Sequence, residues 1–248
     1  MNDSRRLRFY TRQRLNPNFL DRILRKSITS LLIWTNIIFF VLVVLLALVI
    51  PNFLNYIVLR PAEVMQGKYL WTFLTSMFMH APGYPIPFIS FHLLINMFVL
   101  YSLGGLSEKI IGRKRFLWFY LISGLIAGLM FVLLAYFFGT TDLGARIFGS
   151  SGIAAVGASG AIFAIAGLFM ILTPKLRFMI IFLPFFSLPA YIMIPLVLFL
   201  TWIVSSGVGI GIGNTAHLGG FLAGVIYGLY LRNKYKRKTV MISKYFSR

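Results

Sequence analysis

Six long apolar segments divide this chain, and they constrain its fold more than any other feature. Charged residues make up only 12% of the 248 residues, whereas hydrophobic residues make up 59%. A water-soluble domain carries roughly 25% charged residues to cover its surface. We therefore predict a membrane protein whose core is shielded by lipid. The six segments lie near residues 31–50, 88–107, 116–138, 153–173, 178–204 and 216–231.

The basic residues between these segments predict the topology. If the N-terminus is placed in the cytoplasm, 21 of the 24 Lys and Arg residues fall on the cytoplasmic side. The three exceptions are Arg60, Lys68 and Arg146. Because basic residues concentrate in cytoplasmic loops, both termini are predicted to be cytoplasmic and the number of spans to be even. Membrane orientation thus explains the net charge of +19 better than nucleic-acid binding does.

We predict one domain, because the sequence shows no internal repeat and no low-complexity linker. The membrane domain is predicted at residues 30–232, between basic cytoplasmic tails at 1–29 and 233–248. The connection at 51–87 is long and rich in aromatic residues, which favour the membrane interface. We expect this outside loop to lie in or on the outer leaflet.

Two of the six segments are not expected to be simple spans. The fifth contains Pro184, Pro189 and Pro195, so it is expected to be broken or partly interfacial. The fourth follows a Gly/Ser-rich stretch at 139–158, and a helix over 159–173 is too short to cross about 30 Å of hydrocarbon. The preceding chain must therefore descend into the protein interior, where non-helical backbone is tolerated only beside protein or water.

Ser159 and His217 are the residues that point most directly to chemistry. From Ser159 to Lys175 is 16 residues, and from His217 to Arg232 is 15. At about 1.5 Å of rise per helical residue, both side chains lie roughly 23 Å above the same membrane face. A hydroxyl and an imidazole at one depth fit the nucleophile and base of a serine hydrolase. Ser159 also opens a helix, whose free N–H groups suit a developing oxyanion.

Each of these residues also fits a purely structural role. Ser159 fits a helix N-cap, and His217 fits an interhelical hydrogen bond. The pattern Gly-x-Ser-Gly occurs a second time, around Ser151. Ser151 is 24 residues before Lys175, which is roughly 36 Å along a helix and would place it at the outer surface. No histidine within a span matches that depth, so the depth argument favours Ser159.

Three further positions fit a hydrolase site at the same level. His92 and Asn96 are four residues apart and share a helix face, and His92 is 17 residues before Lys109. Both side chains can donate hydrogen bonds to an oxyanion, although a polar contact between helices is the alternative. Phe163, one turn after Ser159, can stack on the imidazole, with plain core packing as the alternative. None of the five acidic residues is in a span near Ser159, so we predict a Ser–His dyad without a carboxylate.

Small residues predict close contact between the fourth and sixth segments. Gly220 and Gly224 are spaced by four and form a packing stripe that continues to Gly228. The fourth segment offers its own small face, which begins at Gly160. Two such helices can approach closely enough for the Ser–His contact.

The chain resembles the rhomboid intramembrane serine proteases over about residues 60–231. The resemblance implies a six-helix all-α membrane bundle in which Ser159 is the nucleophile and His217 the base. It also implies an oxyanion hole formed by His92, Asn96 and the Ser159 backbone N–H. Two departures are Thr72, where an arginine is common, and a Pro-rich insert between His80 and His92. The motifs, in the family's order, are His92-x-x-x-Asn96, Gly104-Gly105-x-x-Glu108, Gly157-x-Ser159-Gly160 and Ala216-His217-x-x-Gly220.

The resemblance further implies an endopeptidase that cleaves transmembrane segments of other membrane proteins. The expected partners are these substrates and the lipid bilayer, with no nucleic acid, no cofactor and no metal. The expected location is the plasma membrane of a prokaryote. The main alternative is a non-catalytic rhomboid-like protein that binds or retains membrane clients. A transporter comes third, because the sequence has no acidic relay and no inverted repeat.

Overall fold

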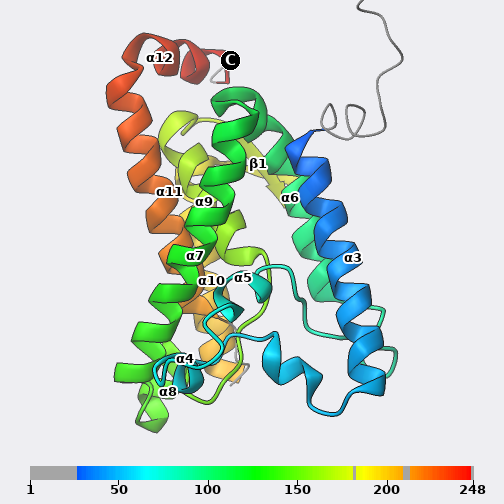
Figure 1. Cartoon of the computed structure of the whole chain (residues 1–248). Coiled ribbons are helices and arrows are strands. Elements are labelled where there is room, and N and C mark those ends of the chain that lie inside the picture. Colours follow the sequence, from blue (N-terminus) through cyan, green and yellow to red (C-terminus); the bar gives the residue numbers. More distant parts are fainter. Residues whose placement is uncertain (1–26, 181–182, 209–212, 247–248) are drawn as a thin grey trace, which may run out of the picture.

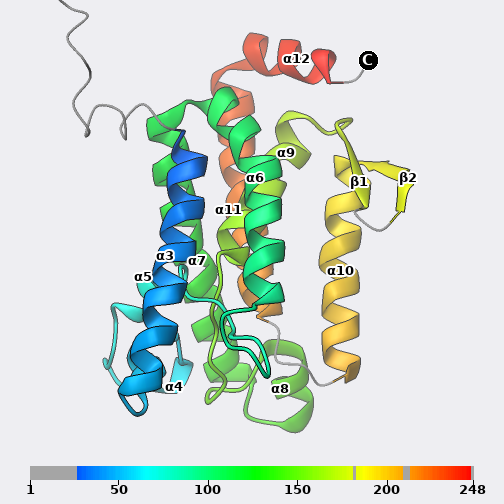
Figure 2. The same ribbon diagram turned by 90° about the vertical axis from the view of Figure 1, so that its right-hand side faces the viewer.

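The computed structural model describes residues 27–180, 183–208 and 213–246, and these residues are mostly helical. Six helices run roughly side by side (Figures 1 and 2). They are α3 (Ile28–Val49), α6 (Phe91–Ile111), α7 (Arg113–Phe138), α9 (Ser159–Leu172), α10 (Ala190–Val208) and α11 (Asn214–Lys234). The shorter elements are η1 (Phe53–Tyr56), α4 (Pro61–Val64), α5 (Thr72–Thr75), α8 (Asp142–Phe148), β1 (Arg177–Ile180), β2 (Leu183–Pro189) and α12 (Lys236–Tyr245).

Four of the described helices are long and apolar enough to cross a membrane. They are α3, α6, α7 and the Ala190–Gly207 part of α10. The apolar helix α9 has only 14 residues, and α11 ends in a basic turn with Arg232 and Lys234. The chain is therefore an integral, multi-pass membrane protein, while six spans and two cytoplasmic termini stay predictions. The predicted tail at 1–29 lies almost wholly outside the described residues, and much of the one at 233–248 forms α12.

Helix α9 occupies the interior of the bundle (Figure 1). It contacts α6, α7, α10 and α11, and ten of its 14 residues are buried. Its sequence has no charge and alternates small residues with Ile, Leu and Phe, which allows neighbours to pack on every side. At about 1.5 Å per residue it is roughly 21 Å long, which is shorter than the hydrocarbon core.

The chain reaches the start of α9 as non-helical backbone, as the length argument predicts. Backbone groups of this stretch pair with the loop between α3 and α6. Leu59 and Ala155 exchange two backbone hydrogen bonds of 3.1 and 2.8 Å, and the Gly157 N–H donates to the Ser76 carbonyl at 2.8 Å. These bonds satisfy backbone groups that would otherwise be unpaired inside the protein.

The chain is mostly helical, as predicted, and a short two-stranded antiparallel sheet is an addition that the all-α prediction did not include. β1 pairs with β2, with Arg177 opposite Pro189. The predicted fifth segment at 178–204 is thus broken, and its helix begins only at Ala190. Pro184 and Pro189 lack the backbone N–H that a helix requires, which explains why residues before Ala190 adopt a hairpin instead.

Glu108 ties the second long helix to the first. Its carboxylate accepts hydrogen bonds from the backbone N–H groups of Ile28 and Thr29 at 2.9 and 3.0 Å, and it lies 3.5 Å from Arg113 Nε. A buried carboxylate compensates the unpaired N–H groups and the positive dipole at the start of α3. The start of α3, the α6–α7 junction and the end of α11 therefore share one end of the bundle (Figure 2). Basic residues gather at this end, which fits a cytoplasmic face.

Candidate active site

Ser159 and His217 meet between the two helices that carry them. Ser159 is the first residue of α9, and His217 lies in the first turn of α11. Ser159 Oγ and His217 Nε2 are 2.8 Å apart. This is a hydrogen-bond distance, so the imidazole can take the hydroxyl proton as the oxygen attacks a carbonyl.

Glycines allow the two helices to approach this closely. A Cβ added at Gly220 would lie 1.9 Å from the Gly160 carbonyl oxygen, and one at Gly224 would lie 1.9 Å from that of Ala164. Both distances are far inside van der Waals contact, so the helix backbones touch directly. The small faces anticipated on the two segments therefore face each other in the structure.

Phe163 lies against the imidazole ring. The two ring centroids are 4.5 Å apart and the ring planes differ by 26°, which is a stacked arrangement. His217 Nδ1 is buried and has no hydrogen-bond partner among the described residues. In the described part of the chain no group of three or more His, Cys, Asp or Glu residues could hold a metal ion. The ring contacts Phe163 by stacking and Ser159 by a hydrogen bond.

His92, the second residue of α6, faces the same space as Ser159. A Cβ added at Gly157 would lie 3.0 Å from His92 Nε2 and 3.7 Å from Ser159 Oγ. Gly157 also has a φ of +122°, which L side chains rarely adopt. Only a glycine leaves this space open between the two side chains, and that is where a reacting carbonyl oxygen would need to lie.

Asn96 lies one turn below His92 and is buried. Its Nδ2 donates to the His92 backbone carbonyl at 2.8 Å. Because a side-chain amide carries two N–H groups, one donor remains for another acceptor. His92 and Asn96 thus lie on the α6 face that looks toward α9.

Ser151, the serine of the second Gly-x-Ser-Gly pattern, is held in the connection before α9. Its carbonyl accepts a hydrogen bond from the Ala62 N–H at 2.9 Å. The imidazole of His217 is bonded to Ser159 instead.

The sequence reasoning missed the part that His80 and Asn36 play beside this site. His80 Nε2 donates to Asn36 Oδ1 at 3.0 Å, and its ring packs edge-on against His92 with centroids 5.1 Å apart. Burial, aided by the nearby His92, lowers the pKa of His80 to about 3. The ring therefore stays neutral and brings no positive charge beside His92. The sequence placed His80 only at the start of the Pro-rich insert, and no pattern linked it to Asn36.

Comparisons with known proteins show the family to which the chain belongs. The family model of the Rhomboid domain matches residues 67–234. The rhomboid protease GlpG of Haemophilus influenzae is 23% identical over 185 residues, which cover 75% of this chain and 81% of that protein. The mitochondrial presenilin-associated rhomboid-like protein of Homo sapiens is 31% identical over 146 residues, or 58% of this chain. The match covers only 35% of that human protein, so the chain spans about a third of its length.

Proposed function

Because the chain belongs to the rhomboid family, we propose that it is an intramembrane serine endopeptidase that cleaves transmembrane segments of other membrane proteins. The observation that carries the proposal is the 2.8 Å contact between Ser159 Oγ and His217 Nε2 in the interior of the bundle. His217 Nδ1 has no hydrogen-bond partner among the described residues, and the contact of Nε2 with Ser159 supports a role as the base that accepts the serine proton.

The proposed reaction uses the residues around this pair. Ser159 Oγ attacks the scissile carbonyl while His217 Nε2 takes its proton. The oxyanion is stabilised by the free Ser159 N–H at the start of α9, by His92 Nε2–H and by Asn96. His217 then returns the proton to the leaving amine, and water hydrolyses the acyl-enzyme by the same steps. Phe163 keeps the imidazole in place throughout.

The substrate must unwind before it can react. In an intact helix, the scissile carbonyl is engaged in the backbone ladder and shielded by side chains. Gly or Pro near the cleavage point makes local unwinding easier, so we expect cuts beside such residues in the outer half of the substrate segment. The bacterial relative matches over most of its own length, which supports the plasma membrane of a prokaryote as the location.

A fluorophosphonate probe tests the proposal directly, because it labels an activated serine. The purified protein is reconstituted in liposomes with a fluorogenic transmembrane substrate. We expect Ser159→Ala and His217→Ala each to lose both labelling and cleavage while remaining folded. Ser151→Ala is the matched control and should keep both. Labelling that survives in Ser159→Ala would mean that another serine is the nucleophile. A wild-type protein that neither labels nor cleaves would identify a non-catalytic client-binding protein instead.

A further inference from the structure

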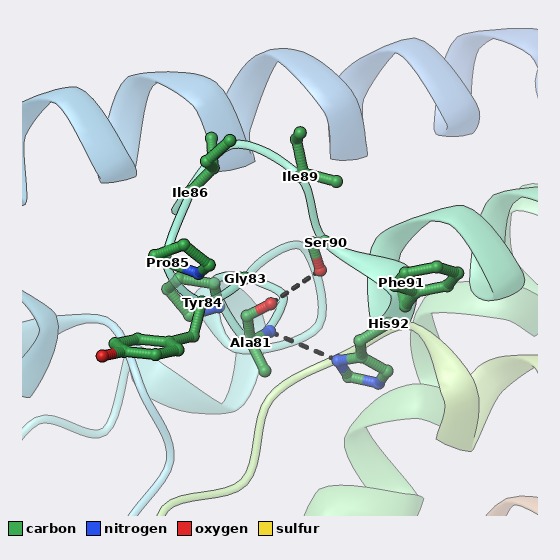
Figure 3. A pocket seen from close by; sticks show the side chains of 10 residues that line it. Ala81, Gly83, Tyr84, Pro85, Ile86, Ile89, Ser90, Phe91 and His92 are labelled. Atoms are coloured by element: carbon green, nitrogen blue, oxygen red, sulfur yellow. Dashed lines mark hydrogen bonds between the residues drawn. The ribbon is translucent and has the colours of Figure 1, made fainter.

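The Pro-rich insert that precedes α6 is attached to His92. Residues 81–90, here called the clamp loop, close on themselves (Figure 3). The Gly83 N–H donates to the Pro87 carbonyl at 3.1 Å, and Ser90 Oγ donates to the Ala81 carbonyl at 2.6 Å. At the base of the loop, the Ala81 N–H donates to His92 Nδ1 at 3.3 Å (Figure 3).

This last bond determines where the His92 proton sits. A neutral imidazole carries one N–H donor and one acceptor nitrogen, and the partner of one nitrogen decides the state of the other. An N–H group can only donate, so Nδ1 must be the acceptor and Nε2 must carry the proton. The ring edge formed by Cε1 and Nε2 faces Gly157, because a Cβ added there would lie 2.7 Å from Cε1, 3.0 Å from Nε2 and 3.7 Å from Ser159 Oγ.

Ser90 fixes the position of Ala81, whose N–H donates to His92, relative to the His92 ring. Its hydroxyl oxygen accepts the Leu93 N–H at 3.0 Å as the N-cap of α6, while its proton is donated to Ala81. One buried hydroxyl therefore connects the first turn of α6, which carries His92, to the residue that donates to His92.

Hydrogen bonds, rather than side-chain packing, determine the position of the clamp loop. The clamp loop surrounds a cavity of about 360 Å³ that reaches His92. Several of its apolar side chains, including Tyr84, Ile86 and Ile89, are exposed. Without a packed core of its own, the loop depends on the Ser90 and Ala81 bonds for its position.

We propose that the clamp loop fixes His92 in the tautomer protonated at Nε2, with Ser90 as the positioning residue that maintains it. This rests on the proposed function in one respect, namely that the Nε2–H group is the oxyanion donor. The proton position itself is a property of the resting protein.

The test is ¹⁵N NMR of the full chain labelled at histidine, because ring nitrogen shifts distinguish the two tautomers. The chain has only three histidines, so His92→Gln assigns the signal. Ser90→Thr retains both hydroxyl bonds, Ser90→Asp retains the N-cap acceptor but cannot donate to Ala81, and Ser90→Ala loses both. Ala81→Pro removes the N–H donor itself.

We expect the wild type and Ser90→Thr to show one His92 tautomer, protonated at Nε2. Ser90→Asp, Ser90→Ala and Ala81→Pro should show a mixture of tautomers. Their kcat should fall on the order of 10-fold with little change in KM, which is less than the 10²–10³ typical for loss of an oxyanion donor. Ser90→Asp separates this effect from loss of the helix cap.

A single Nε2-protonated tautomer in all three disrupted variants would overturn the inference. So would a wild type protonated at Nδ1. If instead the tautomer shifts as expected while the wild type cleaves no substrate, the clamp stands and the proposed protease function fails.

Discussion

Replacing Gly220 with alanine should separate the two helices that carry Ser159 and His217. The added Cβ would lie 1.9 Å from the Gly160 carbonyl oxygen. An ordinary carbon–oxygen contact is roughly 3.3 Å, so the backbones must move apart by about 1.4 Å. No flexible side chain can yield instead, because the obstacle is backbone.

The contact between Ser159 and His217 is close to this obstacle on both helices. Gly160 directly follows Ser159, and Gly220 lies three residues after His217. A movement of about 1.4 Å would stretch the 2.8 Å Ser–His contact to roughly 4 Å, beyond hydrogen-bonding distance. A misplacement of about 1 Å typically lowers the rate on the order of 10²-fold, so cleavage by Gly220→Ala should fall by about that factor. Overpacking should also lower the free energy of unfolding of this variant by about 1–3 kcal/mol.

The assay compares cleavage in liposomes with thermal unfolding in detergent for Gly220→Ala and a matched control. Gly105→Ala is the control, because a Cβ there meets nothing within 4 Å. This control should keep full activity and gain up to about 1 kcal/mol from helix propensity. If Gly220→Ala cleaved substrate at nearly the wild-type rate, the close-packing account of the site would be refuted.

Substitutions at four other residues probe separate parts of the structure. His92→Ala and Asn96→Ala should each lower kcat on the order of 10²–10³-fold with little effect on KM, and a change confined to KM would exclude the oxyanion role. Phe163→Ala removes a stacked ring worth about 0.5–1.5 kcal/mol, so turnover should fall up to about 10-fold. Phe163→Tyr keeps the stack, and equal losses in both variants would show that stacking is not the cause. Glu108→Ala removes the acceptor of the Ile28 and Thr29 N–H groups, while Ser27 still caps α3, and it should lower the free energy of unfolding by about 3 kcal/mol, measured by denaturant titration. A loss below about 1 kcal/mol would mean that water replaces the carboxylate.

The Ser159–His217 contact could be anticipated because helix rise is fixed and basic residues mark the membrane face. The depths of two residues in the membrane can then be compared, even on separate segments, without knowing the fold. The short length of α9 likewise implied a descending chain before it. In contrast, the bond between His80 and Asn36 joins residues 44 positions apart, and no local pattern reports such a pairing.

The pairing of β1 with β2 shows a second limit of prediction from the sequence. Prolines indicated that the fifth segment is interrupted, but an interruption alone does not determine what replaces the helix. The pairing of β1 with β2 depends on contacts made after the chain turns. The path of the loop between α3 and α6 could not be predicted either, because it depends on backbone hydrogen bonds between distant residues, such as Leu59 and Ala155.

The enclosure of α9 changes how the protein should respond to different lipids. A helix exposed to acyl chains must tilt or bend when the bilayer becomes thicker or thinner, because its apolar length has to match. In this protein, the helices whose apolar length must match the bilayer are α3, α6, α7 and α10. Helix α9 is surrounded by protein and already too short to span, so no match with the bilayer is demanded of it. Ser159, the proposed nucleophile, therefore lies on a helix that need not match the thickness of the bilayer.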